Sequence, residues 1–123
     1  MALPTNLFAD MTTLYGINNC ETVKKARTWL ESQGITYHFH DFRKDGLDES
    51  LLTAWEAELG WEALLNRRGT SWRKLDEGQR DGMDRTKALA LMLGQPTLIK
   101  RPVVATGTKT MLGFNAEAYA DTL

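Results

Sequence analysis

Residues 12–40 read TTLYGINNCETVKKARTWLESQGITYHFH, a segment that predicts a strand, a helix and a second strand. The β-branched and aromatic residues at 12–17 are typical of a strand. A helix is predicted at about 21–33, because one face carries apolar residues at spacings of three and four: Val23, Ala26 and Leu30. Residues 35–40 alternate apolar and polar side chains, as in a strand. A helix between two strands favours a parallel pair with a right-handed crossover.

The chain then changes to a helical pattern at about 48–93. Asp48 and Asp84 are suitable N-cap residues, and apolar residues at helical spacing follow each of them. Gly60 and Gly94 are suitable residues to end these helices. We therefore expect an all-helical insertion over this stretch.

The C-terminal segment predicts two more strands and a helix. Residues 103–106 and 109–113 are strand-like and are separated by a tight turn at Gly107-Thr108. Asn115 is a suitable N-cap for a short final helix. The complete order, β-α-β, helical insertion, β-β-α, indicates an α/β fold of thioredoxin-like architecture with a four-stranded mixed sheet. Such an analogy gives a fold and not a function.

Length and composition are those of one ordinary folded domain. We expect residues 1–11 to form a flexible leader and residues 12–123 to form a single domain. Fifteen Lys and Arg against sixteen Asp and Glu give a net charge of −1, which argues against a dedicated nucleic-acid-binding protein. No apolar run approaches the roughly 20 residues that a membrane helix needs. We expect a monomer with no membrane contact.

Cys20 is the single cysteine in the chain. A single cysteine can form no intramolecular disulfide, and it does not indicate a cysteine-based metal site. Such sparse use of cysteine is typical of proteins of the reducing cytoplasm. At the start of a predicted helix, unpaired N–H groups and the helix dipole stabilise a thiolate, which is the nucleophilic form. Lys24, one turn later, adds positive charge. An inert buried cysteine is the alternative interpretation, but the strand–turn–cysteine–helix context favours a nucleophile.

Arg101-Pro102 immediately precedes the strand predicted at 103–106. In a thioredoxin-like fold we expect this proline to lie beside the loop that carries Cys20, where either a cis or a trans peptide bond can precede it. Arg101 would then bind a carboxylate or an oxyanion. An ordinary proline at a strand start, with a solvated arginine, fits the residues equally well.

Two sequence segments together resemble the ArsC/Spx family, and within it the YffB-like branch. They are YGINNCETVKKA at 15–26 and LIKRPVV at 98–104. A third segment, GFN at 113–115, resembles the C-terminal end of the family pattern. The resemblance implies a thioredoxin-like domain with inserted helices and a cis bond before Pro102. It also implies that Cys20 is the active-site cysteine.

Arsenate reductases of this family attack arsenate with that cysteine, and glutathione and glutaredoxin supply the reducing power. They hold the oxyanion with three arginines. Arg101 matches one of them. Asn66 stands where the first arginine is expected, followed by Arg67 and Arg68, and no arginine is found near Gly113-Phe114. The resemblance thus implies weak arsenate reduction at most, because much of the oxyanion clamp is missing.

Spx members are redox-sensing transcription regulators that bind RNA polymerase, and their switch is a Cys-x-x-Cys pair. Val23 occupies the second position here, so an intramolecular switch cannot form. The rival interpretation is therefore an adaptor that docks RNA polymerase without a disulfide.

The sequence best fits a cytoplasmic glutathione-dependent thiol reductase with Cys20 as its nucleophile. Glutathione is the expected co-substrate, glutaredoxin is a candidate partner, and no metal is expected. The residues expected to bind substrate or glutathione are Asn19, Lys24, Arg68, Arg101 and Pro102.

Overall fold

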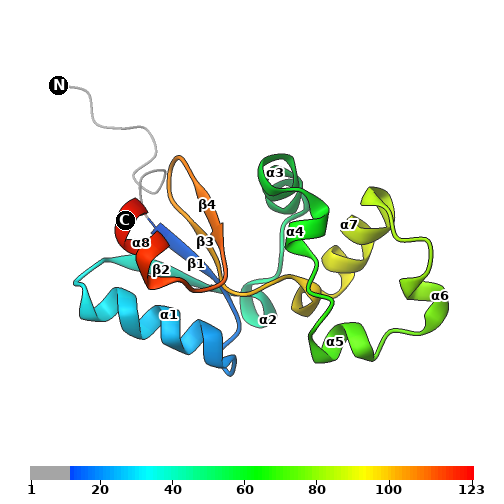
Figure 1. The fold of residues 1–123 in the computed structure, drawn as a ribbon, viewed down its shortest axis with the longest axis horizontal. Helices are drawn as coiled ribbons and strands as arrows, with labels where there is room; N and C mark the ends of the chain where they lie inside the picture. Colours follow the sequence, from blue (N-terminus) through cyan, green and yellow to red (C-terminus); the bar gives the residue numbers. More distant parts are fainter. Residues whose placement is uncertain (1–11) are drawn as a thin grey trace. The chain divides into compact units, whose positions relative to one another are not determined.

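The computed structural model describes residues 12–123, so the leader predicted at 1–11 lies outside the described residues (Figure 1). The chain divides into two compact units. We call residues 12–43 and 101–123 the sheet unit, and residues 44–100 the helical unit. That residues 12–123 form a single domain stays a prediction.

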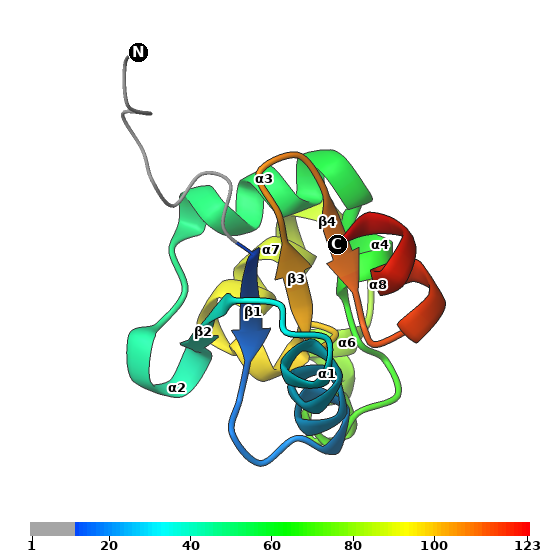
Figure 2. The ribbon, with the colours of Figure 1, turned by 90° about the vertical axis from the view of Figure 1, so that its left-hand side faces the viewer.

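The sheet unit contains four strands in the order β2-β1-β3-β4 (Figure 2). They are β1 (Thr12–Gly16), β2 (Tyr37–Asp41), β3 (Val103–Ala105) and β4 (Thr110–Leu112). β1 and β2 are parallel, whereas β3 is antiparallel to both β1 and β4. The predicted parallel pair and the thioredoxin-like mixed sheet are confirmed.

Helix α1 (Glu21–Ser32) ends in a backbone motif that requires a left-handed residue. Gly34 has a φ of 68°. Its N–H donates to the Glu31 carbonyl over 3.1 Å, and the Ile35 N–H donates to the Leu30 carbonyl over 3.0 Å. These two bonds form a Schellman motif. Because residue 35 takes part in the helix end, β2 begins at Tyr37, two residues later than the alternation suggested.

One row of apolar residues crosses the sheet and forms the centre of the core. The strand register aligns four of them: Phe39, Leu14, Val104 and Met111. Two helices, α1 and α8 (Ala116–Thr122), pack buried side chains against this row: Val23, Ala26, Leu30 and Tyr119. Both helices therefore cover the same face of the sheet. The Tyr119 hydroxyl donates to the Gly113 carbonyl over 2.6 Å, and burial raises the pKa of Tyr119.

The helical unit consists of short helices joined by tight loops. Helix α2 (Phe42–Asp45) leads into it from the sheet unit. The remaining elements are α3 (Glu49–Leu59), α4 (Trp61–Leu64), α5 (Thr70–Arg73), α6 (Glu77–Arg80), α7 (Arg85–Gly94) and the 3₁₀ turn η1 (Pro96–Leu98). The stretch predicted to be helical at about 48–93 therefore contains α3 to α7.

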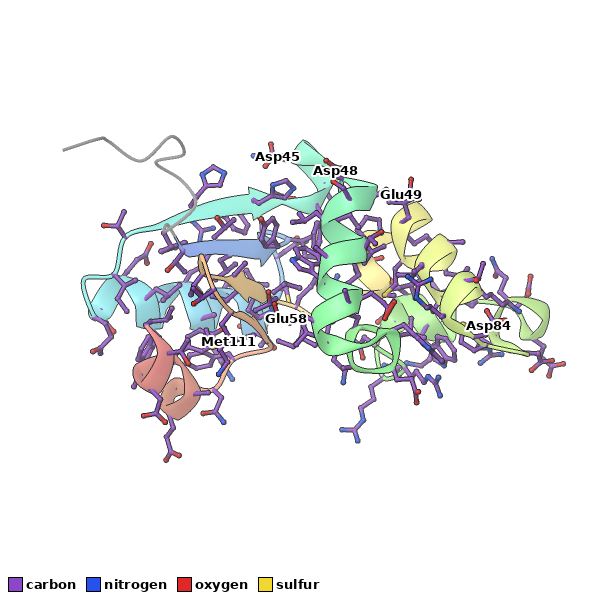
Figure 3. All side chains as sticks on the ribbon, turned by 90° about the horizontal axis from the view of Figure 1, so that it is seen from above. Asp45, Asp48, Glu49, Glu58, Asp84 and Met111 are labelled. Atoms are coloured by element: carbon purple, nitrogen blue, oxygen red, sulfur yellow. The ribbon has the colours of Figure 1, made fainter. Side chains whose placement is uncertain are left out.

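Two helix starts in this unit follow the predicted N-cap residues, which Figure 3 labels. The Asp48 carboxylate accepts from the Ser50 N–H over 3.1 Å, and the Asp84 carboxylate accepts from the Lys87 N–H over 2.8 Å. Helix α6 was not predicted, although it begins with a capping box between Asp76 and Gln79.

Candidate functional site

Cys20 is the N-cap residue of α1. Its backbone is extended, with φ −105° and ψ 124°, and its carbonyl accepts from the Lys24 N–H over 3.0 Å. Within residues 12–123, no side chain caps this helix start. The side chain at an N-cap lies against the unpaired N–H groups of the first turn. The thiol is free and half-buried against the core, so it is neither sealed off nor fully solvated.

A close approach between Gly16 and Val23 fixes the loop that carries Cys20. A Cβ atom built on Gly16, the last residue of β1, would lie 2.7 Å from Cγ2 of Val23. Val23 is fully buried and is the third residue of α1. The missing side chain at residue 16 therefore lets the first turn of α1 pack directly on the end of β1.

Two further predicted site residues flank Cys20. Asn19 is exposed, and its Oδ1 accepts from Nη1 of Arg43 over 3.5 Å. Lys24 is also exposed, and its Nζ lies 3.5 Å from the Glu21 carboxylate. A solvated ion pair of this kind contributes little to stability. Lys24 can therefore exchange Glu21 for another anion at little cost.

Pro102 follows a cis peptide bond, as the sequence predicted. The last pair in the β1–β3 register joins Tyr15 to Val103, which sets Pro102 level with Gly16. Because the strands are antiparallel, the start of β3 lies at the same end of the sheet as the end of β1. The prolyl loop and the loop leading to Cys20 therefore emerge from the same end of the sheet unit.

Arg101 has a guanidinium nitrogen that lacks a partner. Its Nη1 is buried, and it makes no hydrogen bond to any part of residues 12–123. A buried donor without an acceptor typically costs ~1–3 kcal/mol. Buried polar groups in native proteins are nearly always satisfied, and an exception calls for an explanation such as a ligand. The ordinary solvated arginine considered from the sequence does not fit this burial.

Arg68 belongs to the helical unit, where it lines an open cavity of about 410 Å³. The other lining residues are Glu62, Leu65, Asn66, Arg67 and Lys100. Two backbone bonds bring the two halves of this wall together: Asn66 N–H to Leu98 carbonyl, and Lys100 N–H to Leu64 carbonyl, each 2.8 Å. Lys100 was not among the predicted site residues, because no local pattern connects it to residue 68.

No metal site is found in the part of the chain that the structure describes. Among residues 12–123, no group of three or more His, Cys, Asp and Glu side chains is arranged to hold an ion. The same residues contain no helix with the length and apolar character that a membrane span requires.

Four features define a thioredoxin-like domain: the mixed sheet, the helices that cover it, the cysteine at the start of α1 and the loop with the cis proline. The chain belongs to the ArsC family, whose model matches residues 15–122.

Solved and curated relatives agree with this assignment. A solved structure named YFFB protein superposes with a TM-score of 0.89 at 50% identity, covering 92% of this chain and 99% of the other. An arsenate reductase (ArsC)-related protein from Brucella melitensis has a TM-score of 0.74 at 48% identity, with coverages of 91% and 93%. The global transcriptional regulator Spx of Streptococcus mutans is 28% identical over 109 residues, or 87% of this chain and 79% of Spx. The family and the YffB-like branch predicted from the sequence are confirmed.

Proposed function

We propose that this protein is a glutathione-dependent thiol reductase that uses Cys20 as its nucleophile. The observation that carries the proposal is the position of Cys20, half-buried and free at the uncapped start of α1. The unpaired N–H groups at this end of α1 carry partial positive charge, which suits a site for an anionic reacting group. The chain has no second cysteine, so a thiol from another molecule has to complete the reaction.

The proposed reaction has two thiol–disulfide exchanges. The Cys20 thiolate attacks the glutathionyl sulfur of a mixed disulfide, forms a Cys20–glutathione disulfide and releases the substrate as a thiolate, which takes up a proton. The thiolate of a second glutathione then attacks the glutathionyl sulfur on Cys20. This step forms oxidised glutathione and regenerates the Cys20 thiolate. In net terms, the mixed disulfide and one glutathione thiol give the substrate thiol and oxidised glutathione, and the proton of that glutathione thiol ends on the released substrate thiolate.

Glutathione carries two carboxylates and an extended peptide backbone, which the proposed binding residues suit. Arg101 supplies a buried guanidinium nitrogen that has no partner among the described residues. Lys24 supplies an exposed ammonium that now pairs with Glu21. Pro102 and Asn19 flank the Cys20 loop and would contact the peptide. Arg68 belongs to the helical unit, and its contact with glutathione stays a prediction.

Mass spectrometry of the intact protein tests the reaction. After incubation with oxidised glutathione, we expect one adduct, located on Cys20 by peptide mapping, because the thiolate attacks the disulfide. Reduced glutathione should remove this adduct. Failure to form it under conditions that modify free cysteine would contradict the proposal.

We expect the Arg101→Met variant to separate ligand binding from stability. Methionine keeps much of the aliphatic stem but removes the buried, unpartnered nitrogen. The free energy of unfolding should therefore stay the same or rise by about 1 kcal/mol. Binding of S-methylglutathione should weaken about tenfold or more, because a charge-assisted hydrogen bond is lost. Urea unfolding and calorimetry measure the two quantities.

Lys109→Met is the matched control, since this exposed lysine lies in the turn between β3 and β4. It should change neither quantity. Undiminished ligand affinity in Arg101→Met would remove Arg101 from the proposed site.

A second candidate function is an adaptor for RNA polymerase. The observation in its favour is the similarity to Spx, which extends over 87% of this chain. Val23 replaces the second cysteine of the Spx-type switch, so docking would have to occur without an internal disulfide. Arsenate reduction is the weaker alternative, because Asn66 stands where the family pattern has an arginine.

A further inference from the structure

Residues 66–87 of the helical unit form a basic stretch that contains seven Arg and Lys residues. Three of them are used within the unit. Lys87 donates to the backbone carbonyls of Gly78 and Asp81, Arg85 pairs with a partly buried carboxylate on α3, and Arg73 donates to a backbone carbonyl in the preceding loop. These side chains stabilise local structure and are not free to bind a ligand.

Three other cations surround the open cavity of about 410 Å³: Arg67, Arg68 and Lys100. Within residues 12–123, none of their side chains forms an ion pair or a hydrogen bond to a carboxylate. Glu62 is the single acidic residue in the wall, and it is not paired with any of the three. The wall therefore carries two more positive charges than negative ones.

Aromatic contacts hold Arg67 in position. Its guanidinium carbon lies 5.7 Å from the ring centroid of Trp61 and 5.7 Å from that of Trp72. Both distances are within the range of a cation–π interaction. A guanidinium placed on an aromatic face keeps the N–H groups at its edge available for an oxyanion. Part of the entropic cost of ordering this side chain has thus been met before any ligand binds.

The backbone on both sides of the cavity is also held in place. Asn66 Oδ1 accepts from the Arg68 N–H over 3.0 Å, which closes a turn at the base of the two arginines. The Lys100 N–H is bonded to the Leu64 carbonyl on the facing segment. Only the ends of two flexible side chains, those of Arg68 and Lys100, remain to be ordered by a ligand.

We propose that this cavity binds a small ligand with at least two negative charges, through phosphate or carboxylate oxygens. The unbalanced charge supplies the attraction, and the fixed guanidinium supplies the geometry. A nucleic acid fits less well, because three of the neighbouring cations are engaged within the protein and the three in the wall line one cavity. Glutathione shares this chemistry through its two carboxylates. The proposal itself does not rest on the reaction of Cys20.

An NMR titration of the ¹⁵N-labelled full chain tests the proposal, with pyrophosphate and citrate as probes at physiological ionic strength. Saturable shifts are expected in the indole N–H signals of Trp61 and Trp72 and in the amides of residues 66–68. The double variant Arg68→Gln/Lys100→Gln should bind at least about tenfold more weakly, because two charge-assisted contacts are lost. Lys74→Gln is the matched control, since Lys74 is an exposed cation of the same unit outside the cavity wall.

Tighter binding of pyrophosphate would identify a phosphate ligand, and tighter binding of citrate a carboxylate ligand; both outcomes support the site. Shifts that do not saturate, or equal affinities in the wild type and the double variant, would overturn it. Equal weakening in Lys74→Gln would also overturn it, because the attraction would then be general and not local. Cys20→Ser should bind both probes as tightly as the wild type does. Failure of the anion site can therefore be distinguished from failure of the thiol chemistry proposed for Cys20.

Discussion

We expect the Cys20→Ser variant to reduce a glutathionylated peptide no faster than glutathione does alone. Serine has nearly the same size as cysteine, but its hydroxyl does not ionise near neutral pH and cannot form a mixed disulfide. The chain contains no other cysteine that could substitute. The rate is measured by coupling the formation of oxidised glutathione to NADPH oxidation through glutathione reductase.

The same variant distinguishes the reductase from the adaptor. Serine at an N-cap is favourable for a helix start, so α1 should be at least as stable as in the wild type. A reductase loses turnover completely with this change. An adaptor without thiol chemistry shows no turnover in either protein, and both bind purified RNA polymerase equally. Turnover retained by Cys20→Ser would rule out Cys20 as the nucleophile.

Gly16→Ala should lower the free energy of unfolding by about 1–3 kcal/mol, the usual cost of overpacking a core. The added Cβ would lie 2.7 Å from Cγ2 and 3.3 Å from Cγ1 of Val23. Val23 has no space to move into, because it is fully buried and its β-branched side chain is stiff. Either α1 moves away from β1 or the side chain leaves its preferred rotamer. Movement of α1 would displace Cys20, so the rate of glutathione adduct formation should fall as well. Urea unfolding measures the stability change.

A double-mutant cycle tests the cause of this effect. Val23→Ala removes both atoms that the new methyl group meets. Gly16→Ala/Val23→Ala should therefore be more stable than the sum of the single changes predicts, by about 1 kcal/mol or more. Gly94→Ala is the control, because a Cβ there meets nothing within 4 Å. It should be neutral or stabilising by up to about 1 kcal/mol. Additive single changes at residues 16 and 23 would refute the proposed contact.

Elements whose signals are local could be predicted from the residues alone. Asp48 and Asp84 cap their helices through N–H groups two and three residues away, and Gly34 ends α1 through bonds that span a few residues. The start of α1 at Cys20 is of the same kind, because the turn before it and the apolar face after it lie within one segment. Helix α6 also has a local signal, the capping box at Asp76.

Which distant residues share an environment depends on the packing of the folded chain. The burial of Arg101 Nη1 without a partner, and the approach of Gly16 to Val23, depend on how elements pack. The cavity joins Lys100 to Arg68 across 32 positions of the chain, through backbone bonds that no periodicity encodes. Periodicity and capping act over about one helical turn, whereas packing selects partners by shape and volume across the whole unit.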